Sequence, residues 1–489
     1  MAGICRSATP IRLRSRSSPR FDPYAGNVRL VLTPEQMRHV DAHSGASFEA
    51  LVERAGYAVA HAARLLMNGT YGRRVVVLAG KGNNGADGRV AARCLENRGA
   101  RVVVFDAERA PMHLADCDLV IDAAYGTGFR GEYIAPATRA QVLAVDIPSG
   151  VDALTGEVRG CPARAAMTVT FGTPKPGLLL HPGREFAGEV SVADIGLAID
   201  RAKEVDPRLL AVVEDDDVVA WVPRRGATAH KWNTGVRAIA GSRGMAGAAR
   251  LACSAAYRAG AGIVHLSSVG VSSDVEVPTE VVYRQLPHDG WARVALADID
   301  RFAAALIGPG LGRGDELVDE FVDFVVGCPR PLVIDGDGLQ LLGSSRDGHH
   351  GRAADVIGRR SAPTVLTPHD GEFSSLVGSA PGHDRIAAAR DAAGQLGATV
   401  LLKGPTTVIA DPSGDALLVE SGDERLATAG SGDVLTGIIA AHLARGASPL
   451  HAAAAGAFVH AATLRDLPDS GVVASDLVAE LNHHDGDHA

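Results

Sequence analysis

Short apolar runs alternate with helix-like stretches along most of this chain of 489 residues. The run at 74–80 is rich in valine and stops at a glycine, which is typical of a buried parallel strand. The alternation predicts a doubly wound α/β sheet, whose ligands bind beyond the carboxyl ends of the strands. The expected strands of this first series are 74–80, 101–105, 119–123, 142–145 and 168–171, with helices at 36–67 and 88–97.

Residues 196–230 interrupt this rhythm and include the acidic cluster Glu214-Asp215-Asp216-Asp217. A second series of the same kind then begins, without sequence similarity to the first. We therefore expect a second, different α/β domain. Its expected strands are 235–240, 262–267, 303–307, 331–335, 364–366 and 399–402, with Ala-rich helices at 247–259 and 450–464.

The length of the chain favours roughly two to four domains, and the two series suggest where they lie. We place the boundary near residue 212, after the first series and beside the acidic cluster. The expected parts are a disordered Arg-rich extension at 1–28, a first domain at 29–212, a second domain at 213–482 and a flexible tail at 483–489.

Composition excludes several classes of partner. The net charge of -9 argues against nucleic acid, because binding to the phosphate backbone needs a basic face. Aromatic residues make up 4% of the chain, too few for a base-stacking platform. No apolar stretch is long enough for a membrane span, so we expect no membrane partner. Six scattered cysteines without a C-x-x-C pair indicate neither zinc nor a disulfide framework and fit a reducing cytoplasm.

The stretch Gly430-Ser431-Gly432-Asp433 precedes an apolar run that predicts a buried helix. Such a junction directs backbone N–H groups and the positive end of a helix dipole at one spot, where phosphate binds or a developing anion is stabilised. Asp433 among those donors could accept a proton from a substrate hydroxyl. Alternatively, the stretch is a structural glycine loop capped by an aspartate.

Three expected strand ends in the first domain carry polar residues. Asn83-Asn84-Gly85-Ala86-Asp87-Gly88 follows one strand, although an ordinary Asn-Gly turn also has such a sequence. Asn84, Asp122 and Ser149 would supply only hard oxygen ligands, which suit a monovalent or alkaline-earth cation rather than zinc. Asp146 ends its strand, where a catalytic carboxylate is expected.

These segments resemble the NAD(P)H-hydrate epimerase domain, together with Phe171-Gly172-Thr173-Pro174-Lys175-Pro176-Gly177 further along. The resemblance covers roughly residues 29–200 and implies a Rossmann-like fold, with potassium held by Asn84, Asp122 and Ser149. Ala86 stands where the family usually has glycine. The implied substrate-binding residues are Asn83, Asn84, Gly85, Ala86, Asp87, Gly126, Thr127, Gly128, Phe129, Arg130, Gly131, Glu132 and Asp146.

The second domain resembles the NAD(P)H-hydrate dehydratases of the ribokinase-like superfamily over residues 230–470. The resemblance rests on Gly308-Pro309-Gly310, Thr367-Pro368-His369, Lys403-Gly404 and the Gly430–Asp433 loop, in that order. It implies ADP as phosphoryl donor, with Mg²⁺. The implied hydrate-site residues are Ala248, Gly310, His369 and Asp433, and the implied nucleotide-binding residues are Lys403, Gly404, Pro405, Thr406, Thr407 and Gly432.

The two resemblances together imply a repair enzyme for NADHX and NADPHX, the hydrated forms of NADH and NADPH. The C6 hydroxyl of the S form would be phosphorylated, with Asp433 as base, and phosphate would then leave. The first domain, assisted by Asp146, would convert the R form into the S form. We expect a homo-oligomer. The alternative is a ribokinase-like hydroxyl kinase with a nucleotide-binding N-terminal module.

Overall fold

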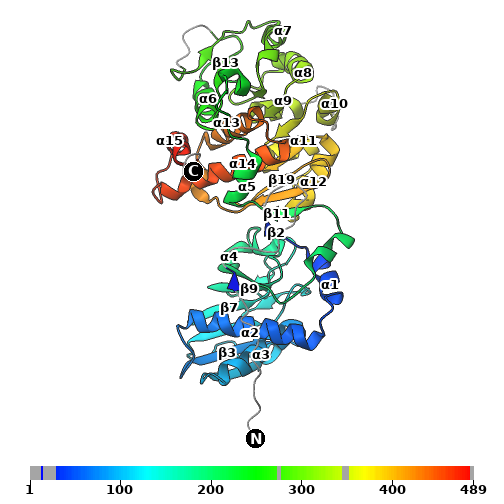
Figure 1. Cartoon of the computed structure of the whole chain (residues 1–489), viewed down its shortest axis with the longest axis vertical. Helices are drawn as coiled ribbons and strands as arrows, with labels where there is room; N and C mark the ends of the chain where they lie inside the picture. The colour runs from blue at the N-terminus through cyan, green and yellow to red at the C-terminus, as the bar shows by residue number, and fades with distance from the viewer. Residues whose placement is uncertain (1–12, 15–28, 272–276, 344–351, 485–489) are drawn as a thin grey trace. The chain divides into compact units, whose positions relative to one another are not determined.

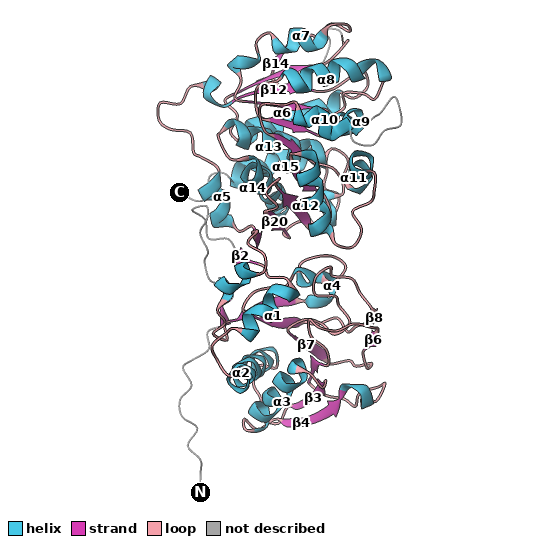
Figure 2. Cartoon of the chain, turned by 90° about the vertical axis from the view of Figure 1, so that its right-hand side faces the viewer, coloured by secondary structure: helices cyan, strands magenta, loops and turns pink. Residues whose placement is uncertain are grey.

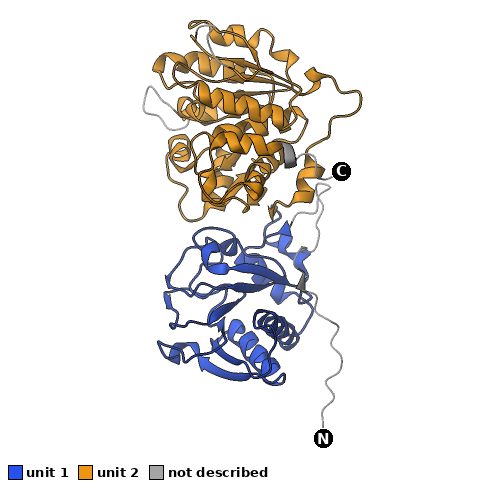
Figure 3. Ribbon diagram, turned by 90° about the vertical axis from the view of Figure 1, so that its left-hand side faces the viewer, with its two compact units in different colours: residues 1–21, 29–207 blue, residues 22–28, 208–489 orange. Residues whose placement is uncertain are grey.

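The computed structural model describes residues 13–14, 29–271, 277–343 and 352–484. The chain forms two compact units that meet along the sequence between Pro207 and Arg208 (Figure 3). This division precedes the boundary expected at 212, because β11 (Leu210–Val212) pairs in parallel with β20 (Ala416–Val419) of the second unit.

The expected terminal segments lie mostly outside the described residues. Within the extension 1–28, the two described residues Leu13–Arg14 form β1, which pairs antiparallel with β10 (Glu189–Ala193). Backbone pairing thus orders two residues of a segment expected to be disordered. At the other end, α15 (Ala474–His484) includes the first two residues of the tail expected at 483–489.

The first unit is built on a parallel sheet with the strand order β10-β9-β7-β5-β3-β4 (Figure 1). The order reverses between β3 and β5, and the carboxyl ends of these neighbours form a topological switch point where ligands bind. All five strands expected for this series are confirmed within one residue at each end. Their bounds are β3 (Arg74–Ala79), β4 (Arg101–Asp106), β5 (Leu119–Ala123), β7 (Gln141–Val145) and β9 (Met167–Phe171).

The single helix expected at 36–67 is two helices. Thr33 caps α1 (Pro34–Ala42) in a capping box with Gln36, and Ser47 caps α2 (Phe48–Leu66). Gly45 between them has a φ of 73°, which breaks the helical path. The Ser44-Gly45 pair and the capping residue Ser47 are the local sequence signals of this break.

The helix expected at 88–97 starts earlier, as α3 (Asn83–Glu96). The segment interpreted as a glycine loop is thus the first turn of this helix. A Cβ atom on Gly85 would lie 1.9 Å from the carbonyl oxygen of Gly80, so glycine is required for α3 to begin this close to β3. The Asn83–Asp87 segment is therefore held rigidly against the switch point.

The second unit has the strand order β14-β13-β12-β15-β16-β17-β18-β19-β20-β11. Its strands are parallel from β14 to β18, and β18, β19 and β20 then pair antiparallel. The order reverses between β12 and β15, which gives this unit its own switch point. The bounds are β12 (Gly235–Ile239), β13 (Ile263–Ser267), β14 (Val282–Tyr283), β15 (Ala304–Ile307), β16 (Leu332–Ile334), β17 (Thr364–Leu366), β18 (Thr399–Leu402) and β19 (Thr407–Ala410).

Helices cover this sheet (Figure 2). The helices discussed below are α6 (Ala246–Arg258), α11 (Asp370–Val377), α12 (Arg385–Leu396), α13 (Ser431–Ala444) and α14 (Pro449–Ala462). Among the described residues, none of the helices combines the length and hydrophobicity that crossing a bilayer requires.

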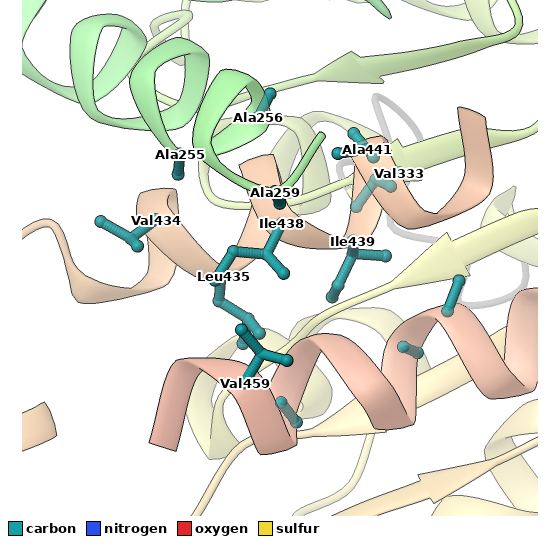
Figure 4. Close-up of a cluster of buried hydrophobic side chains, with 14 of the residues drawn as sticks. Ala255, Ala256, Ala259, Val333, Val434, Leu435, Ile438, Ile439, Ala441 and Val459 are labelled. Atoms are coloured by element: carbon teal, nitrogen blue, oxygen red, sulfur yellow. The ribbon is translucent and has the colours of Figure 1, made fainter. Parts of the chain in front are cut away.

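Helix α13 lies between α6 and α14 in the core of the second unit (Figure 4). Its faces carry Val434, Leu435 and Ile438, whereas α6 presents small alanines that let the two helices approach closely. A Cβ atom on Gly437 would lie 2.1 Å from the carbonyl oxygen of Ala252. This packing fixes the position of α13 and hence of its N-terminal turn.

Candidate functional sites

The switch point of the first unit opens into a cavity of about 990 Å³. Nine of the substrate-binding residues expected from the sequence line this cavity: Asn83, Asn84, Asp87, Gly126, Thr127, Gly128, Phe129, Arg130 and Asp146. Gly85, Ala86, Gly131 and Glu132 are not among its lining residues. Gly85 instead packs against the backbone of Gly80.

Asp122, Ser149 and Asn84 form one hydrogen-bonded cluster, as expected. The Ser149 hydroxyl donates to Asp122 Oδ1 at 2.7 Å, and the Ser149 N–H donates to Asp122 Oδ2 at 3.0 Å. Asn84 Nδ2 donates to the carbonyl oxygen of Tyr125 at 3.0 Å, and the Ser149 hydroxyl accepts from the Tyr125 N–H. The loop after β5 therefore ties the three side chains together.

The donor set of this cluster fits a potassium ion. Burial raises the pKa of Asp122, although its hydrogen bonds from Ser149 and Ala124 offset part of that rise. Among the described residues, Asp122 forms no ion pair with a lysine or arginine, so a bound cation would supply an electrostatic partner for its buried carboxylate. Because Asn84 donates through its nitrogen, its Oδ1 atom remains available as a ligand. The available ligands are oxygens, which potassium and other hard cations prefer.

Asp146 directly follows β7 and has a φ of 66°, in the left-handed region that non-glycine residues rarely adopt. Lys175 Nζ donates to Asp146 Oδ1 at 2.6 Å, and the Thr170 hydroxyl donates to the same atom at 3.0 Å. Lys175 is almost fully buried. Strain of this kind persists where the surrounding structure enforces it, commonly at functional sites.

Two more carboxyl groups face the same cavity. Burial, with smaller contributions from Asp146 and Asp41, raises the pKa of Asp87 to about 8. Burial also raises the pKa of Asp41 on α1, where Lys175 partly opposes the effect. Asp87 is therefore mostly protonated at neutral pH and can donate a hydrogen bond to a ligand.

In the second unit, Asp433 lies in the first turn of α13. Burial and the nearby Asp335 carboxylate raise the pKa of Asp433 to about 7, against the lowering effect of Lys403. Gly430 caps the helix with a φ of 89°, which favours glycine. The Ser431 N–H donates to the Thr428 carbonyl oxygen at 3.2 Å, whereas the N–H groups of Gly432 and Asp433 have no acceptor within the helix and suit an anion.

Asp335 and Lys403 form a partly buried ion pair beside this helix end. Lys403 Nζ donates to Asp335 Oδ1 at 2.7 Å, and the Thr436 hydroxyl donates to Asp335 Oδ2 at 2.5 Å. A Cβ atom on Gly432 would lie 3.2 Å from Lys403 Nζ, so the glycine loop packs directly on the lysine. The structure thus brings together Lys403, Gly432 and Asp433, all expected from the sequence.

The remaining hydrate-site residues surround the same strand ends. A Cβ atom on Gly310 would lie 3.1 Å from Ala248 Cβ, so these two residues are neighbours after β15 and on α6. His369 caps α11, where its Nδ1 accepts from the Gly371 and Glu372 N–H groups. Burial raises the pKa of Glu372, and Lys403 opposes that rise, which places this carboxyl near the lysine.

The nucleotide-binding segment expected at 403–407 is the turn between β18 and β19. Arg385 of α12 donates to the Lys403 carbonyl oxygen at 2.7 Å and also pairs with Asp370. Thr406 is buried in this turn, whereas Gly404 and Pro405 are exposed. Lys403 bonds to Asp335 beside α13, whereas Gly404 and Pro405 are exposed, so the turn extends from that cluster toward solvent.

Some residues at these sites were not predicted as site residues from the sequence. Lys175 forms an ion pair with Asp146, and Asp335 forms the partly buried pair with Lys403. Ser431 bonds to the buried His460 at 3.1 Å. Asp335 directly follows the apolar run Leu332–Ile334, which is the same signal that selected Asp146. No such sequence pattern marks Lys175, because only the folded chain brings this residue close to the end of β7.

Two family models match the chain, one in each unit. A family model described as NAD(P)H-hydrate dehydratase matches residues 236–483, and one described as YjeF-related protein N-terminus matches residues 48–115 and 106–177. The bifunctional NAD(P)H-hydrate repair enzyme of Moorella thermoacetica is 36% identical over 84% of this chain and 87% of its own length. That of Thermofilum pendens is 38% identical over 90% of each chain.

Among solved structures, the ADP/ATP-dependent NAD(P)H-hydrate dehydratase of Bacillus subtilis, co-crystallised with ATP and Mg²⁺, is 30% identical. It covers 56% of this chain and 96% of its own, with a TM-score of 0.48. The relatives named above extend over both units and most of their own lengths. The chain belongs to the family of bifunctional NAD(P)H-hydrate repair enzymes.

Proposed function

We propose that the protein repairs NADHX and NADPHX in two steps at two separate sites. The first unit interconverts the R and S forms, and the second dehydrates the S form at the expense of ADP. The observation that best supports this proposal is that each unit has, at its own switch point, a carboxyl group beside a lysine and a second carboxyl group with a raised pKa. A strained Asp146 lies beside Lys175 in the first unit, and Asp433 lies beside the Asp335–Lys403 pair in the second.

Phosphorylation solves the chemical problem of dehydration. Hydroxide is a poor leaving group, whereas phosphate leaves easily once it is attached to C6. Asp433, with a pKa of about 7, accepts the proton of the C6 hydroxyl as the phosphoryl group is transferred to that oxygen. The N-terminal turn of α13 stabilises the charge on the transferring group. The lone pair of the ring nitrogen then expels phosphate, and loss of a C5 proton restores the dihydronicotinamide.

The nucleotide and its Mg²⁺ ion would approach the same carboxylates. We propose that Lys403, Gly404, Pro405, Thr406, Thr407 and Gly432 hold the nucleotide, while Ala248, Gly310, His369 and Asp433 line the hydrate site. Bound Mg²⁺ neutralises charge on the phosphates. The support for this division is that Gly432 packs on Lys403, whereas Gly310 packs on Ala248 of α6.

In the first unit, we propose that Asn84, Asp122 and Ser149 hold potassium. The ion would neutralise the buried Asp122 carboxylate and help to order the loop after β5. The substrate would occupy the cavity between α3 and the 126–130 loop, where Asp87 can donate a hydrogen bond and Asp146 can accept a proton.

One assay tests both activities. Pure protein is mixed with racemic hydrate, Mg²⁺, potassium and either ADP or ATP, and recovery of reduced-nicotinamide absorbance is followed. Complete recovery of both epimers, with release of inorganic phosphate, is expected. A stable phosphoester instead of free phosphate would identify an ordinary hydroxyl kinase. Recovery of only half the hydrate would show that the first unit does not catalyse epimerisation.

We propose that the protein works in the cytoplasm. The five described cysteines are free, which fits the reducing cytoplasm where nicotinamide nucleotides are used. We propose a homo-oligomer, which light scattering on the purified chain tests directly. The relative rates on NADHX and NADPHX follow from the same absorbance assay.

A further inference from the structure

The ammonium group of Lys175 is fully committed inside the protein. Besides Asp146 Oδ1, it donates to the Thr170 hydroxyl at 2.8 Å and to the Phe171 carbonyl oxygen at 3.0 Å. These three bonds use all three of its protons. Its side chain is 2% exposed. Lys175 is therefore neither a free nucleophile nor a substrate ligand, and any role in catalysis must act through Asp146.

The two oxygens of Asp146 have different surroundings. Oδ1 accepts hydrogen bonds from Lys175 and Thr170. Oδ2 accepts none from any described residue, although the side chain lines the cavity and is 15% exposed. The carboxylate is thus anchored through one oxygen, and the other is free to accept a proton from a bound molecule.

Asp146 lies close to two further carboxyl groups. Asp41 faces it from α1 and Asp87 faces it from α3, while Thr170 and Lys175 contact it from β9 and the loop that follows. Of these three carboxyl groups, Asp146 alone accepts a hydrogen bond from the buried ammonium group of Lys175, which anchors that carboxylate.

We propose that Lys175 is a positioning residue of the epimerase, which holds Asp146 in the orientation of a base for the C6 hydroxyl of the hydrate. This inference rests on the proposed epimerase function. Asp146 Oδ2 takes the hydroxyl proton, and the C6–O bond becomes a carbonyl as the C6–N1 bond breaks. Its electron pair goes to N1, which takes up a proton. Rotation about the C5–C6 bond presents the other face of the aldehyde, and the reverse steps close the ring as the opposite epimer.

The test follows epimerisation alone, without any nucleotide. Pure S-hydrate is incubated with protein and potassium, and the appearance of R-hydrate is measured by chromatography. Dehydration does not proceed under these conditions, because no phosphoryl donor is present. If the wild-type protein does not accelerate the approach to the racemic mixture, the proposed epimerase function fails. If the wild type does so, the variants test Lys175.

The variant Lys175→Met keeps the length of the side chain but removes its charge. We expect kcat to fall about 10²-fold with KM nearly unchanged, since a displaced base reduces rate more than binding. The acid limb of the kcat–pH profile should move up by about one unit, because the carboxylate loses its cation. Propylammonium should partly restore the rate of Lys175→Ala. The exposed Lys203→Met is the matched control and should behave as wild type.

Three results would overturn the proposal. One is a folded Lys175→Met protein with wild-type kcat. Another is a reduced kcat with an unshifted pH profile and no rescue by propylammonium, which would make the lysine purely structural. If both lysine variants fail to fold, Thr170→Val removes one bond to Asp146 and one to Lys175. A kcat about threefold to tenfold lower, with the same upward shift of the acid limb, is then expected, and an unchanged kcat rejects the inference.

Discussion

Replacement of Asp433 by asparagine should make the second unit more stable while it abolishes dehydration. The pKa of this carboxyl is about 7 in the folded protein, against 3.8 for an ordinary aspartate. The folded state therefore keeps a proton that the unfolded chain releases between these values. Its stabilising contribution is fully present below pH 4 and is lost as the pH rises to about 7.

The size of the effect follows from that difference. A shift from 3.8 to about 7 corresponds to about 4 kcal/mol at a pH above 7, which is the electrostatic cost of ionising Asp433 in its buried position. Asparagine has no such cost, so Asp433→Asn should gain up to about 4 kcal/mol over wild type at pH 8 and almost nothing at pH 4. For a domain of this size, that gain corresponds to a rise of roughly 8–16 °C in the melting temperature.

Thermal unfolding of the full chain at pH 4, 6 and 8 measures this gain, and the transition of the first unit serves as an internal reference. Dehydration of pure S-hydrate should fall about 10²–10⁴-fold in the same variant, because the amide accepts no proton. The wild-type rate should rise with pH and level off above about 7. The exposed Asp466→Asn is the control. A variant no more stable than wild type at pH 8 would refute the burial argument, and near-normal turnover would remove Asp433 from the chemistry.

Three further predictions concern the two sites separately. Asp122→Ala should weaken the dependence of epimerisation on potassium and slow it, with dehydration of S-hydrate unchanged; equal damage to both reactions in a folded protein contradicts two separate sites. Asp87→Asn resembles the protonated carboxyl and should keep KM within about threefold, whereas Asp87→Ala should not, as steady-state epimerisation kinetics measure. Gly430→Ala should destabilise the protein by about 2–4 kcal/mol in denaturant unfolding, since its Cβ would lie 2.5 Å from Leu251 in a left-handed conformation.

Periodicity and short motifs predicted the expected strands well, because most of them are short, apolar and buried. Strand β4, with Val103 and Val104 exposed, is the exception. Strand β17 matches its expected bounds of 364–366, and the polar residues at the strand ends do meet at the switch points. The start of α3 at Asn83 was not predictable from glycine content, since the same residues suit a turn. Only the close approach of Gly85 to Gly80 explains why glycine stands inside a helix.

Long-range ion pairs could not be predicted from the sequence. Lys175 is 29 residues from Asp146, and Lys403 is 68 residues from Asp335. Each pair depends on strands that become neighbours or near neighbours only in the folded sheet. A lysine in a glycine- and proline-rich segment gives no local sign that it will be buried, so the groups that tune the carboxylates were found only from the structure.

The two units, though unrelated in sequence, arrange their charges in the same way. Each has a lysine–aspartate pair at the end of a strand, with Nζ–Oδ1 distances of 2.6 Å for Lys175–Asp146 and 2.7 Å for Lys403–Asp335. Each also has a second carboxyl near the start of a helix with a raised pKa, about 8 for Asp87 and about 7 for Asp433. Pairs of carboxyl groups whose environments differ in this way divide acid and base roles between them. In the first unit the proposed base is the paired Asp146, whose Oδ2 accepts no hydrogen bond from a described residue and whose side chain lines the cavity. In the second unit both oxygens of the paired Asp335 are occupied, by Lys403 and Thr436, which supports the proposal that Asp433 is the base.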